Sequence, residues 1–415
     1  MLVPKLRFKR EDGTEYPEWG NKSFANAFAP LNNNTFSRDM LSENGTVLNI
    51  HYGDILVKFG EVCDIQAMDI PKVNAEIDTS KYDELQDGDI ILADTAEDET
   101  VGKAIEIYHT GTSKVVSGLH TMACRPNDKY APKYMGYYIN SPTYHNQLLP
   151  YMQGIKVTSI GRKNIADTVI YYPADLEEQQ KIANFLSTVD EVIAQSESEV
   201  QNLEQQKKAA MQKIFSQEVR FKREDGTDYL DWEDCILSDY CEEIKSSIDP
   251  QKYPNDTFLE YSMPAFDMDK TPSTVIGSDM NSNRKIVSNP CVLINKLNVR
   301  KKRIWKVPNP TDNSVCSAEF IPVTSNKMSI DFLEHLALSD RFTARLLDCS
   351  TGTSNSQKRV TPDIIMDMPI TIPCFEEQQK IADFLSAYDE AISYAKQELD
   401  KWKELKKGLL RQMFV

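Results

Sequence analysis

The chain has no long apolar run and no cysteine or histidine spacing typical of a metal site. No segment of its 415 residues reaches the roughly 18 to 20 consecutive apolar residues that cross a bilayer, and the basic first ten residues lack the apolar stretch of a secretory signal. The eight cysteines form no CxxC pair, and the five histidines show no ligand spacing beside them. These absences predict a cytoplasmic protein with reduced, mostly buried thiols and no bound metal.

Sequence motifs of nucleotide-dependent and nuclease chemistry are also missing. There is no GxxxxGK(S/T) phosphate loop and no (N/D)PP(Y/F) motif of amino-methyltransferases. Carboxylates such as Asp89 and Glu106 belong to no PD…(D/E)xK arrangement, and we interpret them as ordinary solvated side chains. The chain is therefore predicted to need no cofactor and to catalyse no reaction by itself.

An internal repeat organises the chain. EEQQKIANFLSTVDE at 177–191 and EEQQKIADFLSAYDE at 376–390 are identical at twelve of fifteen positions, and the same offset of 199 relates KKAAMQKIF at 207–215 to KKGLLRQMF at 406–414. A second pair is LRFKREDGTEYPEW at 6–19 and VRFKREDGTDYLDW at 219–232. Such self-similarity predicts duplicated structural units. The expected fold is α+β, with two globular α/β domains separated by two long antiparallel helices in a coiled coil and related by an internal pseudo-twofold repeat.

The repeat and two prolines set the predicted boundaries. Pro173 and Pro373 each precede a repeated helix, where proline is tolerated. The predicted segments are a globular domain at 1–173, a helix at 174–218, a second globular domain at 219–373 and a helix at 374–415. Each globular domain then has about 150 residues, which is a common domain size.

Both predicted helices carry apolar residues in alternating steps of four and three. Such a narrow stripe is typical of a coiled-coil seam, although two separate helices that each lie on their own domain are an alternative. The predicted seam residues are Ile182, Leu186, Val189, Ile193, Val200, Leu203, Ile381, Leu385, Tyr388, Ile392, Leu399 and Trp402.

The chain connectivity predicts the direction of the helices. The second globular domain begins where the first helix ends and ends where the second helix begins. A domain of this size is about 40 Å across, whereas a helix of about 39 residues extends about 58 Å. The helices should therefore run antiparallel, with one domain at each end. By the same symmetry, residues 6–19 should lie beside the C-terminus.

The repeated residues resemble the specificity subunit of type I restriction-modification enzymes. The similarity lies in EEQQKIA at each helix start, KKGLL followed by QMF at the end, the RFK…W segment and two dissimilar globular domains. It implies two target-recognition domains that each read one half of a bipartite double-stranded DNA target. It also implies that the coiled coil sets their spacing and docks two methyltransferase subunits. Restriction and translocase subunits would join this complex, and catalysis of DNA methylation and cleavage would belong to these partners.

The predicted DNA contacts are lysines and arginines in three places. The run at 300–303 can bind phosphate or guanine, although charge runs are also typical of solvated turns. Two further loops, GIKVTSIGRKN and TGTSNSQKRVT, occupy corresponding places in the two domains, although their serines and threonines are equally typical of turns. The predicted DNA-binding residues are Lys156, Arg162, Lys163, Arg300, Lys301, Lys302, Arg303, Lys358 and Arg359.

The net charge of −16 does not favour DNA binding, because contacts to DNA phosphates need cations. Other functions therefore stay open. Local basic patches or a partner subunit can supply them despite the overall charge. An alternative, which the acidic balance favours, is a scaffold or decoy that binds methyltransferase subunits without reading DNA. A third possibility is an enzyme in its own right, which would require hydrolysis by the isolated chain.

Overall fold

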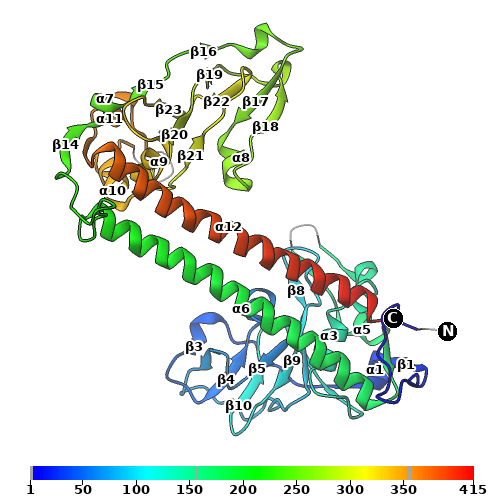
Figure 1. Cartoon of the computed structure of the whole chain (residues 1–415). Coiled ribbons are helices and arrows are strands. Elements are labelled where there is room, and N and C mark those ends of the chain that lie inside the picture. The colour runs from blue at the N-terminus through cyan, green and yellow to red at the C-terminus, as the bar shows by residue number, and fades with distance from the viewer. Residues whose placement is uncertain (1–2, 155–156, 353–357) are drawn as a thin grey trace. The chain divides into compact units, whose positions relative to one another are not determined.

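The computed structural model describes residues 3–154, 157–352 and 358–415, so Lys156 lies outside the described residues. The chain forms two compact units: unit 1 is Met1–Glu197 with Glu398–Val415, and unit 2 is Ser198–Gln397 (Figure 1). Each long helix contributes one part to each unit. The division into segments 1–173, 174–218, 219–373 and 374–415 stays a prediction.

Unit 1 has a central five-stranded sheet in the order β2-β11-β7-β9-β5, which is antiparallel except where β5 pairs with β9. Its other sheets have the orders β10-β4-β6-β3, β1-β13 and β12-β8. The strands are β1 (Trp19–Ser23), β2 (Phe28–Pro30), β3 (Leu41–Ser42), β4 (Val47–Ile50), β5 (Val62–Asp64), β6 (Lys72–Val73), β7 (Ile90–Ala93), β8 (Thr95–Ala96), β9 (Ala104–Tyr108), β10 (Lys114–Ser117), β11 (Thr121–Pro126), β12 (Thr158–Ser159) and β13 (Val169–Pro173).

The central strand β7 shows why this sheet is buried on both faces. Successive side chains of a strand point to opposite faces. Ile90 and Leu92 belong to one apolar cluster, whereas Ile91 and Ala93 belong to another. The short helices that pack around the sheets are α1 (Phe24–Ala27), η1 (Arg38–Met40), α2 (Tyr52–Val57), α3 (Tyr134–Ile139), α4 (Pro142–His145), η2 (Leu149–Tyr151) and α5 (Arg162–Ala166).

Unit 2 repeats this plan around the strand β20. Val292 and Ile294 face one cluster while Cys291 and Leu293 face another. The sheet orders are β15-β23-β20-β21, β16-β19-β22-β17-β18 and β14-β24. The strands are β14 (Glu233–Ile236), β15 (Glu242–Glu243), β16 (Ser247–Ile248), β17 (Thr257–Tyr261), β18 (Ser273–Ile276), β19 (Arg284–Ile286), β20 (Cys291–Asn295), β21 (Ile304–Val307), β22 (Ser314–Ser317), β23 (Phe320–Thr324) and β24 (Pro369–Ile372). The short helices are α7 (Leu237–Tyr240), η3 (Pro250–Lys252), α8 (Met263–Met268), η4 (Gly277–Asp279), α9 (Ile330–Leu338), α10 (Asp340–Asp348) and α11 (Pro362–Met366).

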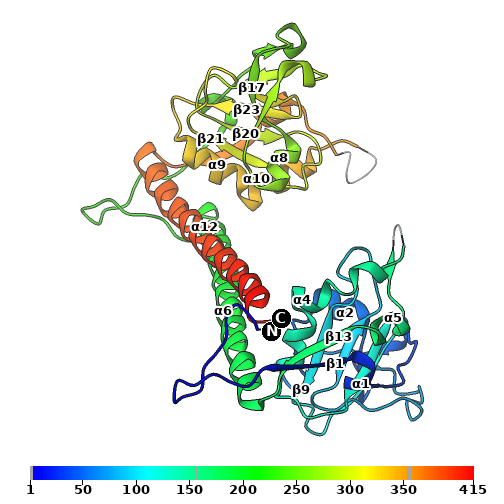
Figure 2. The same ribbon diagram turned by 90° about the vertical axis from the view of Figure 1, so that its right-hand side faces the viewer.

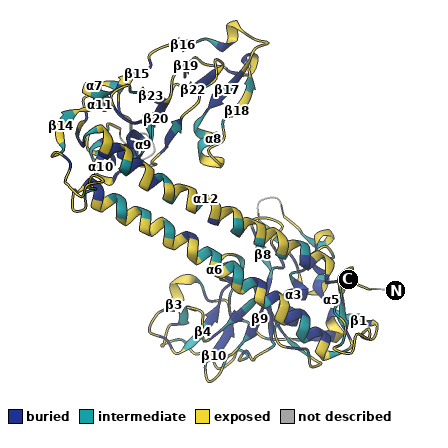
Figure 3. Cartoon of the chain, in the orientation of Figure 1, coloured by how far each residue is buried: buried dark blue, intermediate teal, exposed yellow. Residues whose placement is uncertain are grey.

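The two long helices are α6 (Leu176–Phe215) and α12 (Phe375–Gln412). Every predicted seam residue is buried or half-buried, while other faces of both helices are exposed (Figure 3). In unit 1, Leu186 of α6 lies in the same core as Leu409 of α12. In unit 2, Leu385 of α12 shares a core with Ile214 of α6. Each helix therefore stabilises both units, and a continuous coiled coil between the helices stays a prediction.

Ion pairs give the direction of the helices inside each unit. In unit 1, Asp190 pairs with Lys406 at 2.6 Å and Glu197 pairs with Lys403 at 2.8 Å. In unit 2, Glu204 pairs with Lys396 at 2.6 Å and Lys207 with Asp389 at 2.5 Å. In both units a later residue of α6 pairs with an earlier residue of α12. The predicted antiparallel direction is therefore confirmed within each unit.

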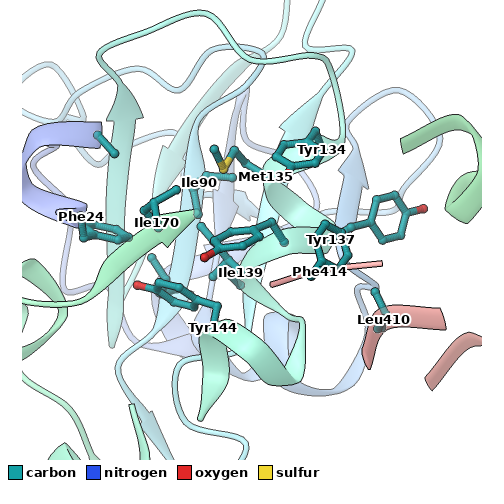
Figure 4. Close-up of a cluster of buried hydrophobic side chains, with 14 of the residues drawn as sticks. Phe24, Ile90, Tyr134, Met135, Tyr137, Ile139, Tyr144, Ile170, Leu410 and Phe414 are labelled. Atoms are coloured by element: carbon teal, nitrogen blue, oxygen red, sulfur yellow. The ribbon is translucent and has the colours of Figure 1, made fainter. Parts of the chain in front are cut away.

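The N-terminal segment lies beside the end of α12, as the repeat predicted (Figure 2). The Leu6 amide donates to the Gln412 carbonyl oxygen at 2.9 Å. The rings of Trp19 and Phe414 are 6.5 Å apart, and Phe414 and Leu410 pack among the tyrosines of α3 (Figure 4). The N-terminal segment and the end of α12 therefore pack together in unit 1.

The repeated motifs form the same junction in both units. In unit 1, the Arg7 guanidinium donates to both carboxylate oxygens of Glu178, at 2.7 and 2.9 Å. In unit 2, Arg220 makes the corresponding pair with Glu377, at 3.3 and 2.8 Å. Both glutamates are fully buried. The sequence similarity between the two copies of each motif is explained by the junction that they form. In each unit it joins a long helix to the segment that packs on it.

Candidate nucleic-acid interface

Two predicted DNA contacts of unit 1, Arg162 and Lys163, begin helix α5 and have exposed side chains. The Arg162 guanidinium donates to the Asn33 side-chain oxygen at 2.7 Å and to the Leu31 carbonyl oxygen at 3.4 Å. These bonds fix its direction and leave other N–H donors of the guanidinium open to solvent. Arg162 is therefore an oriented surface cation with a second positive charge next to it.

A short ladder holds the segment that precedes α5. Strand β12 pairs antiparallel with β8, and the Ile160 amide donates to the Asp94 carbonyl oxygen at 3.0 Å. The Asp94 amide in turn donates to the His120 carbonyl oxygen at 3.1 Å. Three segments that are distant in sequence thus lie side by side.

Polar side chains gather on this ladder of unit 1. The Thr95 hydroxyl donates to the Asp94 carboxylate at 2.8 Å, and Nδ1 of His120 lies 3.3 Å from the same carboxylate. The His120 side chain is 48% exposed, so it can contact a ligand. Side chains of these types can bind the edges of bases in the major groove. This cluster could not be predicted, because no local sequence pattern connects residues 94 and 95 to residue 120.

Unit 2 repeats the ladder and places Lys358 and Arg359 on it. The Val360 amide donates to the Lys296 carbonyl oxygen at 3.0 Å, and the Lys296 amide donates to the Glu319 carbonyl oxygen at 2.9 Å. These bonds match those that join residues 160, 94 and 120 in unit 1. The backbone of the two units is therefore alike at this edge.

The side chains on the unit 2 ladder differ from those of unit 1. The Arg359 guanidinium contacts both carboxylate oxygens of Glu319, at 3.1 and 3.2 Å. The Lys358 carbonyl oxygen accepts a hydrogen bond from the Asn298 amide at 2.8 Å, which brings this ladder beside the loop that leads to Arg300. Arg300, Lys358 and Arg359 therefore belong to neighbouring segments. Glu319 was missed because it lies 40 residues from Arg359 in the sequence.

The four residues of the basic run at 300–303 differ in their acidic partners. Arg303 is nearly buried and forms an ion pair with Asp267, which also lies 3.9 Å from Lys301. Lys302 pairs with Asp340 at 2.7 Å. Arg300 is exposed, and within the described parts of the chain its side chain has no acidic partner. A DNA contact by each of these residues stays a prediction, and the structure gives Arg303 a role in joining β21 to α8.

Asp89 and Glu106 are buried, so their interpretation as solvated carboxylates was wrong. Arg125 donates to both oxygens of Asp89, at 2.9 and 2.7 Å. Glu106 accepts hydrogen bonds from the amides of Lys133 and Gly136 at the start of α3, at 2.5 and 2.9 Å. Burial raises the pKa of Glu106 to about 7. Each carboxylate thus has structural partners, which accounts for it without nuclease chemistry.

The thiols also have structural environments. Burial raises the pKa values of Cys63, Cys241 and Cys291 to about 12, so these residues remain protonated and unreactive at neutral pH. In the described ranges, no group of three or more His, Cys, Asp or Glu residues is placed to hold a metal ion. Within the same ranges, no helix is both long and apolar enough to span a membrane.

Comparison with known proteins relates this fold to one family. The family described as "Type I restriction modification DNA specificity domain" matches the chain twice, over residues 32–205 and 230–403. A Methanocaldococcus jannaschii protein described as "Putative type I restriction enzyme MjaX specificity subunit" is 25% identical over 382 residues, which cover 87% of this chain and 83% of that protein.

Two solved structures share the fold. The type I restriction-modification S subunit from M. genitalium has a TM-score of 0.54 and 13% identity, and the match covers 100% of this chain and 99% of that one. A chain from a structure of the type I R-M system has a TM-score of 0.59 and 15% identity, over 96% and 98% of the two chains. Because the family matches most of the chain in two copies, the chain belongs to the type I restriction-modification specificity subunits, which are non-catalytic and carry two target-recognition domains.

Proposed function

We propose that this chain selects the DNA sequence on which a type I restriction-modification complex acts, with each unit reading one half of a bipartite target. The observation that carries this proposal is the ladder shared by the two units. Its backbone hydrogen bonds are alike, whereas its side chains are Asp94, Thr95 and His120 in unit 1 and Glu319 and Arg359 in unit 2. A common support with different polar groups suits two readers of different sequences.

The exposed cations supply a local attraction for DNA despite the net charge of −16. Arg162 and Lys163 lie near the ladder of unit 1, and Arg300 and Lys358 near that of unit 2. Phosphate contacts by such residues position a protein on DNA, and base contacts then select the sequence. The remaining phosphate contacts come from the methyltransferase subunits in this proposal.

Repeated apolar surfaces support the docking of two identical partners. Phe185 of α6 packs edge-on against Phe8 at 5.8 Å, and Phe384 of α12 packs against Phe221 at 5.5 Å. Phe185 and Phe384 are each 39% exposed. Partly exposed aromatic side chains are enriched at protein interfaces. We assign one methyltransferase subunit to each of these pairs, with restriction and translocase subunits joining the assembled complex.

The helices are the spacer in this proposal. Buried or half-buried seam residues along α6 and α12 support a coiled coil that fixes the number of unread base pairs between the half-sites. The complex would act in the cytoplasm, where cellular DNA is accessible to it.

A scaffold or decoy that binds methyltransferase subunits without reading DNA is the competing function, and the acidic net charge favours it. The discriminating experiment joins the purified chain with its methyltransferase subunits and maps methylated positions in a random DNA library. Replacement of residues 219–373 by the matching domain of a paralogue should change one half-site only. An unchanged motif, or methylation without any motif, would reject the proposed reading of DNA. Gel-shift binding at several stated salt concentrations measures the affinity directly.

A further inference from the structure

Arg359 has an exposed side chain, and its backbone is paired with a neighbouring segment on each side. Its amide donates to the Thr351 carbonyl oxygen at 2.8 Å, and its own carbonyl oxygen accepts from the Thr351 amide at 2.9 Å. On its other side, Arg359 forms an antiparallel bridge with Leu297. Two neighbouring segments thus fix the origin of the Arg359 side chain.

The Arg359 side chain is also oriented. Its terminal nitrogens lie 3.1 and 3.2 Å from the two carboxylate oxygens of Glu319, and 51% of the side chain is exposed. A guanidinium has five N–H donors, and one of them forms the hydrogen bond to Glu319. The remaining donors can still form the paired hydrogen bonds by which arginine recognises O6 and N7 of guanine.

The pairing with Glu319 favours a base over a phosphate as the ligand of Arg359. Glu319 offsets the positive charge that would attract a phosphate, so the pair gives little non-specific attraction. It leaves the directional hydrogen bonds of the planar guanidinium in place. Lys358 next to it has no acidic partner within the described residues, and it can supply the phosphate contact.

Comparison of the two units distinguishes the pair of Arg359 and Glu319, which is not repeated in unit 1, from the ion pair that both units share. Arg7 and Glu178 of unit 1 recur in unit 2 as Arg220 and Glu377, and they form the same buried ion pair. On the ladder, by contrast, Ser159 and His120 of unit 1 occupy the places of Arg359 and Glu319 in unit 2. The shared fold therefore forms without an ion pair at this position.

We propose that Arg359, oriented by Glu319, reads a guanine in the half-site bound by unit 2. This inference rests on the proposed function, since it names the chemical group that one unit recognises. Arg359 is the contacting residue and Glu319 is a positioning residue. The half-site bound by unit 1 is read at the matching place by different groups, because Ser159 stands there.

The test reconstitutes the full chain with its methyltransferase subunits and determines the methylated motif in a random DNA library. Arg359→Ala should lower the preference for guanine at one position of one half-site by about ten- to a hundredfold. Arg359→Lys keeps the charge but loses the planar pair of donors, so it should relax the same position. The other half-site and the spacer should not change in either variant.

The variant Glu319→Gln tests an effect on DNA binding that is not expected if Glu319 has a purely structural role. It removes the negative charge beside Arg359, so binding to non-target DNA should tighten and its salt dependence should steepen by about one contacted phosphate. Arg341→Ala, which removes another exposed arginine of unit 2, is the matched control and should leave the motif unchanged.

Two results overturn the proposal in different ways. If the unmodified chain gives a bipartite motif and both Arg359 variants keep it, the role of Arg359 is wrong and the proposed function stands. If the unmodified chain gives no motif, the proposed function fails and the inference fails with it. Thermal unfolding of each variant shows whether a lost motif results from unfolding. If Arg359→Ala does not fold, the motif methylated with Arg359→Lys decides whether Arg359 reads guanine.

Discussion

Arg7 and Glu178, which are 171 residues apart in the chain, form a two-point ion pair inside unit 1. The glutamate side chain is fully buried and the arginine side chain is 11% exposed. The pair joins the segment that follows the N-terminus to the first turn of α6. Arg220 and Glu377 form the same junction in unit 2.

Loss of the arginine from this junction should destabilise unit 1. Arg7→Ala leaves the Glu178 carboxylate buried without its ionic partner, and removal of one member of a buried pair costs about 3–5 kcal/mol. The measurement is the free energy of unfolding of unit 1 in urea. Lys9→Ala is the control, because the pair of Lys9 with Glu15 is largely exposed and should change stability little. Equal effects of the two variants would contradict this account.

The start of α6 should behave as part of a packed core. Leu186 is fully buried in unit 1, and truncation of a buried leucine to alanine costs about 2–5 kcal/mol. Leu405→Ala is the control on α12, because that side chain is 48% exposed. Thermal unfolding should show a clear loss of stability for Leu186→Ala and a small one for Leu405→Ala. A reversed order would show that the helix packs in another register.

The stability of unit 1 should depend on pH through Glu106. Burial raises its pKa from 4.5 to about 7, so between these values the folded unit holds a proton that the unfolded chain releases. The free energy of unfolding should therefore fall as the pH rises through this range, by roughly 3 kcal/mol for this group. Urea unfolding at pH 4.5 to 8 measures it. Glu106→Gln should remove this part of the pH dependence, and an unaltered slope would refute the assignment.

Phe185 and Phe384 should each affect the binding of one methyltransferase subunit. Truncation of an interface aromatic costs more than about 1 kcal/mol at a site that dominates binding, so Phe185→Ser and Phe384→Ser should each weaken one of two binding steps about tenfold. Native mass spectrometry then shows complexes with one methyltransferase subunit in place of two. Val57→Ser, which alters a side chain that is 88% exposed outside these pairs, is the control. Loss of both subunits from a single variant would argue against two independent sites.

The features that could be predicted from the sequence are those that short repeated motifs encode. The motifs at 177–191 and 376–390 lie at the starts of α6 and α12. The chain connectivity predicted the helix direction, and the repeat of residues 6–19 at 219–232 predicted the place of the N-terminal segment. Periodic apolar residues such as Leu186 and Leu385 indicated which helix face is buried.

The polar contacts could not be predicted because each joins distant segments. Arg303 looked like a free cation, but its partner Asp267 lies 36 residues away. Arg359 and Glu319 lie 40 residues apart and meet because the segments that carry them both hydrogen-bond to the backbone of Lys296. Glu106 looked solvated until α3 placed two backbone amides beside it. These contacts follow from the sheet order, which no local pattern of the sequence specifies.

The most direct test of the central claim is the spacer length read by a chain with lengthened helices. Insertion of four residues into both α6 and α12, at facing positions, adds about 6 Å. At roughly 3.4 Å per base pair, the methylated motif should keep both half-sites and gain one or two unread base pairs between them. An unchanged spacer in a folded complex that still methylates DNA would contradict the claim that the paired helices set the distance between two readers.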